Sequence, residues 1–505
     1  MSVSSGLNRV TLICCAVAAA LLVTAVVVGR DSSAPTPQRA DGRDVPTSTQ
    51  TRDPSEPVDV IRPVSTVQAP TEISRRLFSA SPIAVLADAA DPEAQRVATA
   101  TAVGLGVPVL VDTPEAPTEL TRLGATQVLT FGRTQAVPGA RAVPVDDAQA
   151  AAEVASLRGD EPAPSRTLDA IVLTRSEQAN AVAVANARTA GAHVIELADA
   201  DPRRNPEAAA YLAEHPQQPV IALGEAFAHV AYPLEVVRRD IQQPTGGYLA
   251  LGGRTYTAMY GHPGAPQLGV LGEQGVRASV KRVERLARKY RRVSSSTFVP
   301  MFEIIATVAS SSAGKDKDYS TETSVKKLLP LVDAAEKAGI YVVLDLQPGR
   351  TDFLTQARRY QSLLERPHVG LALDPEWRLK KKQKHLVQIG SVTAAEINRT
   401  SAWLADLTRE KALPQKIFVL HQFSLSMIKN RSSLDTTRPE LATVIHVDGS
   451  GPQGAKQDTW QVLRRNAPAG VGWGWKNFVD EDSPMLNARE TWREVKPHPD
   501  LVTYQ

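Results

Sequence analysis

Short apolar runs alternate with Ala-rich amphipathic segments over most of the chain. From Pro82 onward, each run is followed by a segment whose apolar residues recur at helical spacing. Strands that alternate with helices of about 10–15 residues are typical of parallel sheets covered by helices on both faces. The pattern therefore predicts an α/β fold. Its repeating unit is short in the first half of the chain and longer in the second.

The pattern within residues 77–240 occurs twice. The first copy has predicted strands at Ile83–Leu86, Val107–Val111 and Gln127–Phe131 and predicted helices at Pro92–Leu105 and Pro117–Leu123. The second has strands at Ala170–Leu173, His193–Leu197 and Pro219–Leu223 and helices at Ser176–Ala190 and Pro206–Ala213. Each copy ends in a glycine just past its last strand, at Gly132 and Gly224. This recurrence predicts tandem parallel α/β repeats of flavodoxin-like type.

Three segments of the first copy carry a family resemblance. They are Ala98–Val111 (ATATAVGLGVPVLV), Leu120–Phe131 (LTRLGATQVLTF) and Gly132–Val137 (GRTQAV). Together with a weaker second copy, they make the region from about Ser81 to Phe227 resemble the cell wall-binding repeat 2 family of Gram-positive surface proteins. The resemblance implies non-covalent attachment to an anionic cell-wall polymer. A plain structural α/β domain is the alternative.

The longer units lie within residues 246–505. The predicted strands are Arg254–Tyr260, Phe298–Val308, Ile340–Asp345, His368–Asp374, Lys416–Leu420, Ala442–Val447 and Gly470–Trp475. The predicted helices are Glu273–Arg292, Ser324–Ala338, Asp352–Glu365 and Thr393–Lys411. These seven strands, with Tyr248–Leu251 as a candidate eighth, predict a TIM-like (β/α) barrel with seven or eight strands. An open doubly wound sheet is the alternative.

Polar and aromatic residues follow or end each of these strands. In chain order they are His262, Glu303, Asp345, Gln347, Asp374, Glu376, Trp377, His421, Gln422, His446, Asp448, Trp473, Trp475 and Lys476. Active sites of such barrels lie at the carboxyl ends of the strands, where the loops converge. A carboxylate at the end of an apolar strand needs a partner to offset its desolvation. We therefore expect these residues to line one cleft.

Three carboxylates are the candidate catalytic residues, namely Asp345, Asp374 and Glu376. Closely placed carboxylates push each other's pKa values apart, so that one remains an acid while another is ionised. Two such groups flanking a glycosidic oxygen are what glycoside hydrolysis requires. The chain is similar in general plan to glycosidase-type barrels, and that likeness implies an acid at the position of Glu376. It leaves the nucleophile unassigned, because the seventh strand ends in Trp475-Lys476 without a carboxylate.

The other residues are candidates for substrate binding. We expect the indoles of Trp377, Trp473 and Trp475 to stack on sugar rings, and the polar side chains to bind hydroxyl groups. The polar set is His262, Glu303, Gln347, His421, Gln422, His446, Asp448 and Lys476. Structural alternatives stay open: Glu303 as an internal ion-pair partner, and His446 and Trp473 as core residues. We expect no metal and no cofactor.

Two other functions remain open. One is a non-enzymatic surface protein that binds wall polymer and carries a degenerate barrel. The other is a divalent-metal hydrolase that uses Asp345, Asp374, His421, His446 and Asp448.

The N-terminus predicts export. Val10–Gly29 contains no charged residue, and 20 residues at about 1.5 Å per residue span a hydrocarbon core. We interpret residues 1–30 as a signal anchor, with a cleaved signal peptide or lipidation of Cys14 as alternatives. Residues 31–76, rich in Pro, Ser and Thr, are the predicted disordered linker. The expected location is the cell membrane, single-pass with extracytoplasmic C-terminal domains, or secreted if the signal is cleaved.

Charge and cysteine content narrow the range of possible partners and chemistries. Residues 1–280 carry a net charge of −7, and residues 281–505 carry +10 and all six Trp. Cys14 and Cys15 are the only cysteines, which excludes a disulfide scaffold and a Cys nucleophile. The basic run Lys380–Lys384 indicates a solvated face, or contacts with phosphate or uronate groups beside a glycan cleft. We expect cell-wall glycan or anionic wall polymer as the partner, the membrane through the N-terminal helix, and no nucleic acid.

Overall fold

The computed structural model describes residues 47–62, 65–146, 148–158 and 165–505. The predicted anchor (1–30) and the first part of the predicted linker lie outside these ranges. Within them, none of the helices combines the length and the apolar character needed to cross a bilayer. Residues Thr47–Gln505 form one compact unit.

The linker prediction is wrong at its C-terminal end. Strands β1 (Gln50–Thr51) and β2 (Val58–Ile61) and helix α1 (Ala69–Leu77) lie within the stretch predicted to be disordered. Strand β2 pairs with a strand of the second repeat, and α1 buries Ile73 and Leu77. These few apolar side chains offset the cost of ordering because they add to cores built by other segments.

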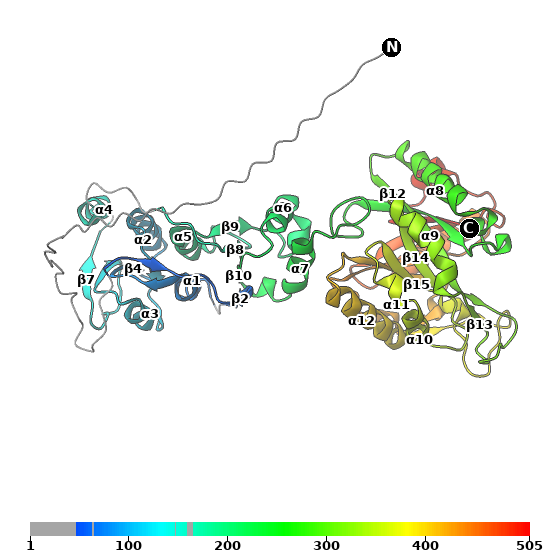
Figure 1. Cartoon of the computed structure of the whole chain (residues 1–505), viewed down its shortest axis with the longest axis horizontal. Helices are drawn as coiled ribbons and strands as arrows, with labels where there is room; N and C mark the ends of the chain where they lie inside the picture. The colour runs from blue at the N-terminus through cyan, green and yellow to red at the C-terminus, as the bar shows by residue number, and fades with distance from the viewer. Residues whose placement is uncertain (1–46, 63–64, 147, 159–164) are drawn as a thin grey trace, which may run out of the picture. The chain divides into compact units, whose positions relative to one another are not determined.

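Two four-stranded parallel sheets follow. Their strand orders are β5-β4-β6-β7 and β9-β8-β10-β2. The strands are β4 (Ile83–Ala87), β5 (Val109–Val111), β6 (Gln127–Phe131), β7 (Arg141–Pro144), β8 (Ile171–Thr174), β9 (His193–Glu196) and β10 (Val220–Leu223). A short strand β3 (Phe78–Ala80) pairs with β1. The pattern that occurs twice in the sequence thus forms two sheets of the same internal order. Figure 1 labels β4 and β7 of the first sheet and β2, β8, β9 and β10 of the second.

Helices cover both faces of each sheet. The helices are α2 (Pro92–Leu105), α3 (Ala116–Leu123), α4 (Ala150–Arg158), α5 (Ala181–Ala190), α6 (Pro206–Glu214) and α7 (Ala231–Arg239). On the first sheet, α2 and α4 pack on one face and α3 on the other. On the second sheet, α1 and α5 pack on one face, and α6 and α7 on the other. Helix α5 contributes side chains to the cores of both sheets.

The two repeats exchange their leading strand–helix segments. Strand β2 and helix α1 precede the first repeat in the chain, yet β2 pairs with β10 and α1 packs on α5 of the second. Strand β7 and helix α4 precede the second repeat, yet β7 pairs with β6 and α4 packs on α2 of the first. Neither repeat is complete without a segment that adjoins the other, so the pair is expected to fold as one unit.

A buried amide fixes this junction. Asn186 of α5 is fully buried, and its side chain accepts from the backbone N–H of Val109 (2.8 Å) and donates to the Val109 carbonyl (2.8 Å). It also donates to the carbonyl of Pro70 in α1 (3.1 Å). One side chain therefore forms hydrogen bonds with the backbone N–H and carbonyl at the edge of β5, and it links three elements of the two repeats.

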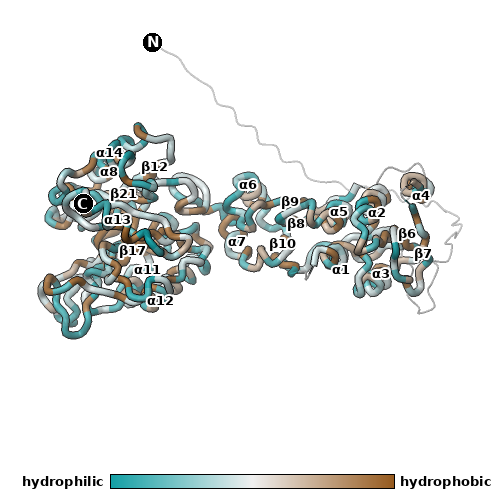
Figure 2. The backbone as a smooth tube through the Cα atoms, turned by 180° about the vertical axis from the view of Figure 1, so that it is seen from behind, coloured by the Kyte–Doolittle hydropathy of each residue, from teal (hydrophilic) through white to brown (hydrophobic). Residues whose placement is uncertain are grey.

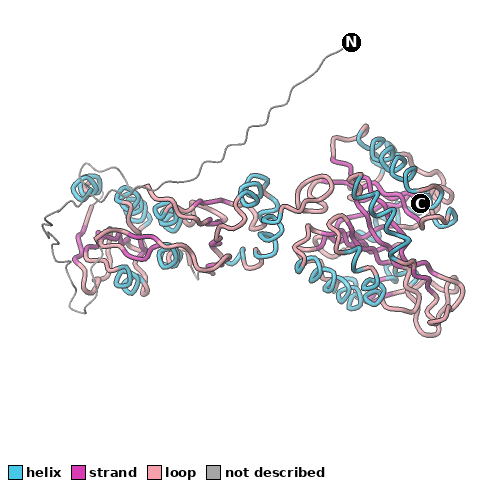
Figure 3. The backbone as a smooth tube through the Cα atoms, viewed as in Figure 1, coloured by secondary structure: helices cyan, strands magenta, loops and turns pink. Residues whose placement is uncertain are grey.

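Eight parallel strands close into a barrel in the second half of the chain. They are β11 (Arg254–Gly261), β12 (Thr297–Ala309), β14 (Tyr341–Leu346), β15 (Val369–Leu373), β17 (Lys416–Gln422), β19 (Leu441–Val447), β20 (Gly472–Asn477) and β21 (Leu501–Tyr504). They neighbour one another in chain order, and β11 pairs with both β12 and β21 to close the ring. The predicted barrel is confirmed, and the open-sheet alternative is excluded (Figure 3).

The predicted eighth strand is wrong. Tyr248–Leu251 is not a strand, and the ring is closed by β21 at the end of the chain. Strand β21 pairs with β11 on one side and with β20 on the other, and these two pairings close the ring.

Helices and short strands surround the ring. The helices are α8 (Val276–Arg291), α9 (Val325–Lys337), α10 (Phe353–Arg359), α11 (Gln361–Leu364), α12 (Ala394–Glu410), α13 (Gln453–Arg464) and α14 (Ala488–Glu494). The additional strands are β13 (Ser320–Glu322), β16 (Val392–Thr393) and β18 (Ile428–Lys429). Outward side chains of the barrel strands pack with these helices in a large core, while inward ones form a separate smaller core. Figure 2 shows hydrophobic (brown) and hydrophilic (teal) residues interleaved along the backbone of these elements.

Candidate active site at the carboxyl ends of the barrel strands

The inside of the barrel changes from apolar to polar along the strands. Its lower part is filled by side chains such as Ala258, Met301, Val343 and Val419. Because side chains alternate along a strand, the residues two positions further on point to the same interior. They form what we call the polar layer: Tyr260, Glu303, Asp345, Asp374, His421, His446, Lys476 and Thr503. Every barrel strand thus supplies one polar group at its carboxyl end.

An imidazole between two carboxylates lies in this layer. His421 Nε2 is 2.8 Å from Glu303 Oε1, and His421 Nδ1 is 2.9 Å from Asp448 Oδ2. Glu303 Oε2 also accepts from the Thr503 hydroxyl (3.0 Å). Burial alone would lower the pKa of His421, but the charge of Glu303 and the hydrogen bonds raise it well above its ordinary value. Burial likewise opposes ionisation of Glu303, yet His421 holds the pKa of Glu303 well below its usual range. The pair is therefore an imidazolium and a carboxylate.

A second imidazole has no hydrogen bond. His446 is fully buried, and neither ring nitrogen has a hydrogen-bond partner among the described residues. Its ring centroid lies 4.8 Å from that of His421, and its Nδ1 lies 3.8 Å from Glu303 Oε1. Burial lowers the pKa of His446, against the pull of Glu303. This ring is therefore a neutral wall of the site.

Asp345 is held by a tyrosine. The Tyr260 hydroxyl donates to Asp345 Oδ2 (2.8 Å) and accepts from Gln347 Nε2 (3.2 Å). The other oxygen, Asp345 Oδ1, has no hydrogen-bond partner among the described residues and lies 3.9 Å from His421 Nε2. Burial raises the pKa of Asp345 to about 6, despite the opposing charge of His421.

Three acids gather at the end of the layer, and we call Asp374, Glu376 and Asp448 the acid trio. Each offers a carboxylate oxygen, and these oxygens all lie within 4.8 Å of one another. Asp374 directly follows β15, and Glu376 lies in the short 3₁₀ turn Pro375–Trp377. Within the described part of the chain, neither makes an ion pair with Arg or Lys.

The members of the trio differ in proton affinity. Burial, followed by the nearby charge of Asp448, raises the pKa of Glu376 to about 7. Burial and Glu376 raise the pKa of Asp374 well above its ordinary value. Burial acts in the same direction on Asp448, but the hydrogen bond from His421 outweighs it and lowers the pKa of Asp448. At neutral pH, Asp448 is therefore ionised beside carboxyl groups that retain protons.

A lysine and a glycine complete the layer. Lys476 Nζ lies 3.8 Å from the ring centroid of Tyr260, which is a cation–π distance. Its charge therefore faces the layer, and it forms no ion pair with a carboxylate of the described residues. Gly474 faces His446, and a Cβ there would lie 2.5 Å from His446 Cδ2. The glycine thus makes room for the imidazole ring.

The two tryptophans of β20 are not in the cleft. Trp475 is fully buried, and Trp473 and Trp475 both contact Trp460 of α13, at centroid distances of 5.9 and 5.7 Å. The predicted sugar stacking by these two residues is therefore wrong. Alternation explains why, because Lys476 points inward and Trp475 next to it must point outward.

Four other predicted binding residues also have partners of their own. Gln422 alternates with His421 and donates to the carbonyl of Ser424 (3.1 Å). His262 Nε2 contacts the hydroxyl of Thr323 (2.9 Å), and the Trp377 ring contacts that of His385 at 5.2 Å. Gln347 borders the layer, but its amide is used by Tyr260 and by the backbone N–H of Ala309. These contacts leave the ionisable residues as the candidate chemistry.

Two members of the layer were not predicted, Tyr260 and Thr503. Alternation along Arg254–Tyr260 puts Tyr256, Ala258 and Tyr260 on one face, a signal available in the sequence. Thr503 required the eighth strand to be placed correctly.

Two groups in this region have the chemistry of a cation site. They are Glu303–His421–His446 and the acid trio, and the ligand-type atoms of each group lie within 4.8 Å of one another. In the first group both nitrogens of His421 are already bonded to carboxylates. A third group, Asp316–Asp318–Glu322, lies on the segment that leads into β13.

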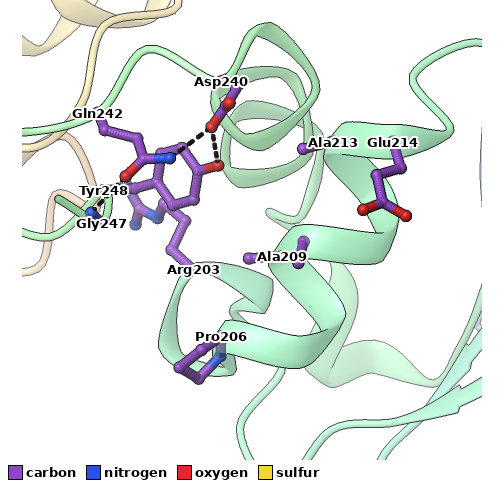
Figure 4. A pocket seen from close by; sticks show the side chains of 10 residues that line it. Arg203, Pro206, Ala209, Ala213, Glu214, Asp240, Gln242, Gly247 and Tyr248 are labelled. Carbon is purple, nitrogen blue, oxygen red and sulfur yellow. Dashed lines mark hydrogen bonds between the residues drawn. The ribbon is translucent and has the colours of Figure 1, made fainter.

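A cavity in the second repeat offers less chemistry. It measures about 410 Å³ and is lined by residues of α6 and of the segment after α7 (Figure 4). Asp240 accepts from the Tyr248 hydroxyl (2.6 Å) and from Gln242 Nε2 (2.7 Å), and Arg203 is paired with Asp201. Asp240 and Arg203 are therefore held by structural partners, whereas Glu214 in the same lining has no ion-pair or hydrogen-bond partner among the described residues.

Comparisons with known proteins add little. No family model and no curated protein matches the chain. Among solved structures, Cwp6 from Clostridium difficile aligns with a TM-score of 0.19 and 12% identity, over 67% of this chain and 66% of that one. The alignment thus spans slightly less than two thirds of Cwp6, and a TM-score this low supports no conclusion about fold or function. The resemblance of residues 81–227 to the cell wall-binding repeat 2 family therefore stays a prediction.

Proposed function

We propose that the barrel is a glycoside hydrolase in which Glu376 is the general acid and Asp448 the nucleophile or base. One observation carries the proposal. Two carboxyl groups of the acid trio lie close together at the carboxyl ends of the strands, and their pKa values are shifted in opposite directions. A protonated and an ionised carboxyl side by side are the requirement of glycosidic cleavage.

The chemistry follows from these roles. Glu376 gives its proton to the glycosidic oxygen as the bond between that oxygen and the anomeric carbon breaks. Asp448 attacks the anomeric carbon, and water then releases the sugar with Glu376 as the base. The short separation of the carboxylate oxygens favours this retaining course, because an inverting enzyme needs about 6.5–9.5 Å between its carboxyls to admit a water.

Neighbouring residues favour the protonated state of Glu376 and the ionised state of Asp448. Asp374, with its raised pKa, stands beside Glu376 as a neutral group. His421 bonds Asp448 and keeps it ionised, while Glu303 on the other ring nitrogen holds the imidazolium in place. Asp345 and Lys476 extend the polar surface toward the substrate.

We further propose that the glycan belongs to the cell envelope. The support is the sequence resemblance of residues 81–227, which implies attachment to an anionic wall polymer, and the uncharged run Val10–Gly29. In this proposal the chain is exported and held at the membrane, and the α/β repeats keep the barrel at its polymer.

The test is hydrolysis of purified wall glycan, followed as new reducing ends. Wild type should release them, and Glu376→Gln should reduce the rate by about 10²–10⁴, the usual contribution of a general acid. The matched control is Glu410→Gln, which makes the same change at an exposed position on α12. Asp448→Asn should be at least as damaging as Glu376→Gln. Activity that survives both substitutions would place the chemistry elsewhere.

The same preparation separates the alternatives. Polymer that sediments with the protein while no reducing ends appear would favour the non-enzymatic wall binder. Activity that is lost in a chelator and restored by a divalent cation would favour metal-dependent hydrolysis at one of the two cation-type groups.

A further inference from the structure

The segment Lys380–Ile389 (KKKQKHLVQI), which we call the basic–apolar loop, combines two exposed features. Leu386, Val387 and Ile389 are 89%, 76% and 52% exposed, the highest values among the large apolar side chains of the described residues. Four lysines precede them, at Lys380, Lys381, Lys382 and Lys384. A folded protein rarely leaves neighbouring aliphatic side chains in water unless the surface meets a partner.

The loop is fixed at its base. The backbone N–H of Gly390 donates to the carbonyl of Glu376 (2.7 Å), and that of Ser391 donates to the carbonyl of Arg378 (3.2 Å). His385 Nε2 contacts the carbonyl of Tyr319 (2.9 Å). A Cβ at Gly390 would lie 2.4 Å from the Glu376 carbonyl oxygen, so the closure depends on glycine. The exposed tip therefore projects from an ordered base beside the proposed general acid.

The charge of the loop is not neutralised locally. In the described part of the chain, none of its four lysines makes an ion pair with a carboxylate. The adjoining segment 315–318 contains two lysines and two aspartates, and so adds no net charge. Behind the loop lies a cavity of about 360 Å³ whose lining includes Lys380, Lys381 and Arg350. Its lining also holds Arg378, which is paired with Glu396, so cationic groups outnumber the one carboxylate of this cavity.

We propose that the basic–apolar loop docks the barrel on a phospholipid membrane that carries anionic headgroups. Leu386, Val387 and Ile389 enter the boundary between headgroups and acyl chains, and the lysines lie in the headgroup plane. A soluble anionic polymer would engage the lysines but leave the three aliphatic side chains in water. The apolar tip is the reason for choosing the membrane.

Docking would bring the acid trio to the membrane surface. The loop begins four residues after Glu376 and returns to it through Gly390, so a glycan held close to the bilayer would be presented to the carboxyl ends of the strands. The docking itself does not depend on hydrolysis. A catalytically inactive barrel should bind vesicles equally well, so the two proposals can fail separately.

The fragment 47–505 is the appropriate protein for the test. It is the compact unit that contains every described helix and strand, and it lacks both the apolar run Val10–Gly29 and the two cysteines. A Val387→Cys substitution therefore creates a single site for the environment-sensitive dye NBD. Vesicles of phosphatidylglycerol and phosphatidylcholine in equal parts should shift its emission to the blue, whereas phosphatidylcholine alone should not.

Sedimentation with the same vesicles tests the two features separately. Replacement of all four lysines by Gln, or Leu386→Ser with Val387→Ser and Ile389→Ser, should weaken binding at least tenfold. The matched controls change equal numbers of exposed residues elsewhere. They are Gln at Lys281, Lys289, Lys326 and Lys327, and Ser at Val103, Val462 and Val479. Both control proteins should bind like the parent fragment.

Three results would overturn the proposal. One is the absence of binding to anionic vesicles. Another is binding that the Ser substitutions leave unchanged, which would assign the surface to a soluble anion. The third is an NBD shift produced equally by inorganic polyphosphate.

Discussion

The repeats and the barrel are both parallel α/β structures, but they use the acids at their strand ends differently. In the first repeat, Asp88 follows β4 and accepts from the backbone N–H of Arg133 (3.1 Å), and Asp112 follows β5 and accepts from that of Gln135 (2.7 Å). These acids tie loops together. In the barrel, the carboxylates of Asp345, Asp374 and Asp448 accept no backbone N–H among the described residues, and each keeps one buried oxygen without a partner, as Asp112 also does.

The difference separates a structural acid from a chemical one. The carboxyl ends of parallel strands gather polar residues in either fold, so position alone does not indicate chemistry. What differs is whether backbone donors occupy the carboxylate. In the barrel, raised pKa values accompany the missing donors at Asp345, Asp374 and Glu376, since burial is not compensated there.

The largest expected effect is on the stability of the barrel. Glu303→Gln leaves the buried charge of His421 without its nearest counter-charge, and breaking a buried pair costs about 3–5 kcal/mol. All six tryptophans lie beyond residue 376, so tryptophan fluorescence during urea unfolding reports on the barrel. The midpoint should fall strongly, whereas Glu410→Gln should leave it in place.

The stability lost in Glu303→Gln should depend on pH. The lowered pKa of Glu303 adds stability above its ordinary value of 4.5, and this is lost as the pH falls through the folded value. The raised pKa of His421 adds stability below its ordinary value of 6.5, lost as the pH rises through the folded value. The difference between wild type and Glu303→Gln should therefore be greatest between these two values. A difference independent of pH would mean that the pair is not charged.

The fold was predictable where local pattern decides it. The alternation of apolar runs and amphipathic helices indicated a barrel because each βα unit carries its own signal. The pairing of β2 with β10 and of β7 with β6 was not predictable, since non-local packing selects the neighbour of an edge strand. Strand β21 was missed because four residues at the chain end show no following helix.

The site was predictable at the level of residue type. Of the predicted acids and imidazoles, Glu303, Asp345, Asp374, His421 and His446 share one layer, whereas His262 bonds Thr323 instead. The roles were not predictable, because the opposite pKa shifts of Glu376 and Asp448 depend on burial and on the His421 hydrogen bond. Trp473 and Trp475 were misplaced, although their alternation with Lys476 carried the signal.

The next largest effect is expected on the stability of the α/β repeats. Asn186→Ala leaves the N–H and carbonyl of Val109 and the carbonyl of Pro70 without their hydrogen-bond partner. Each buried group that stays unpaired lowers the free energy of unfolding by about 1–3 kcal/mol. We expect a total of about 2–4 kcal/mol, seen by far-ultraviolet circular dichroism. Tryptophan fluorescence should hardly change, because residues 47–240 contain no Trp. A parallel loss in both signals would show that the repeats and the barrel unfold together.

The pH profile of hydrolysis tests the opposite pKa shifts. Glu376 must be protonated and its pKa is about 7, so kcat/KM should fall about tenfold per pH unit above that value, and about a hundredfold by pH 9. The acidic limb should lie below the ordinary pKa of an aspartate, because the hydrogen bond from His421 lowers the pKa of Asp448. Glu376→Gln should remove the alkaline limb from the residual activity. A profile that is flat above pH 7 would contradict the assignment of the acid.

The smallest effect concerns the fit of Gly474 against His446. Gly474→Ala places a methyl group 2.5 Å from His446 Cδ2, and overpacking of this kind costs about 1–3 kcal/mol. His446→Ala removes the ring that the methyl would meet, so Gly474→Ala should cost much less in that background. Urea unfolding of wild type, both single variants and the double variant gives the coupling energy. Additive losses would mean that the glycine is needed for the backbone of β20 and not for the imidazole. Additive losses would also mean that the imidazole of His446 does not determine which residue fits at position 474.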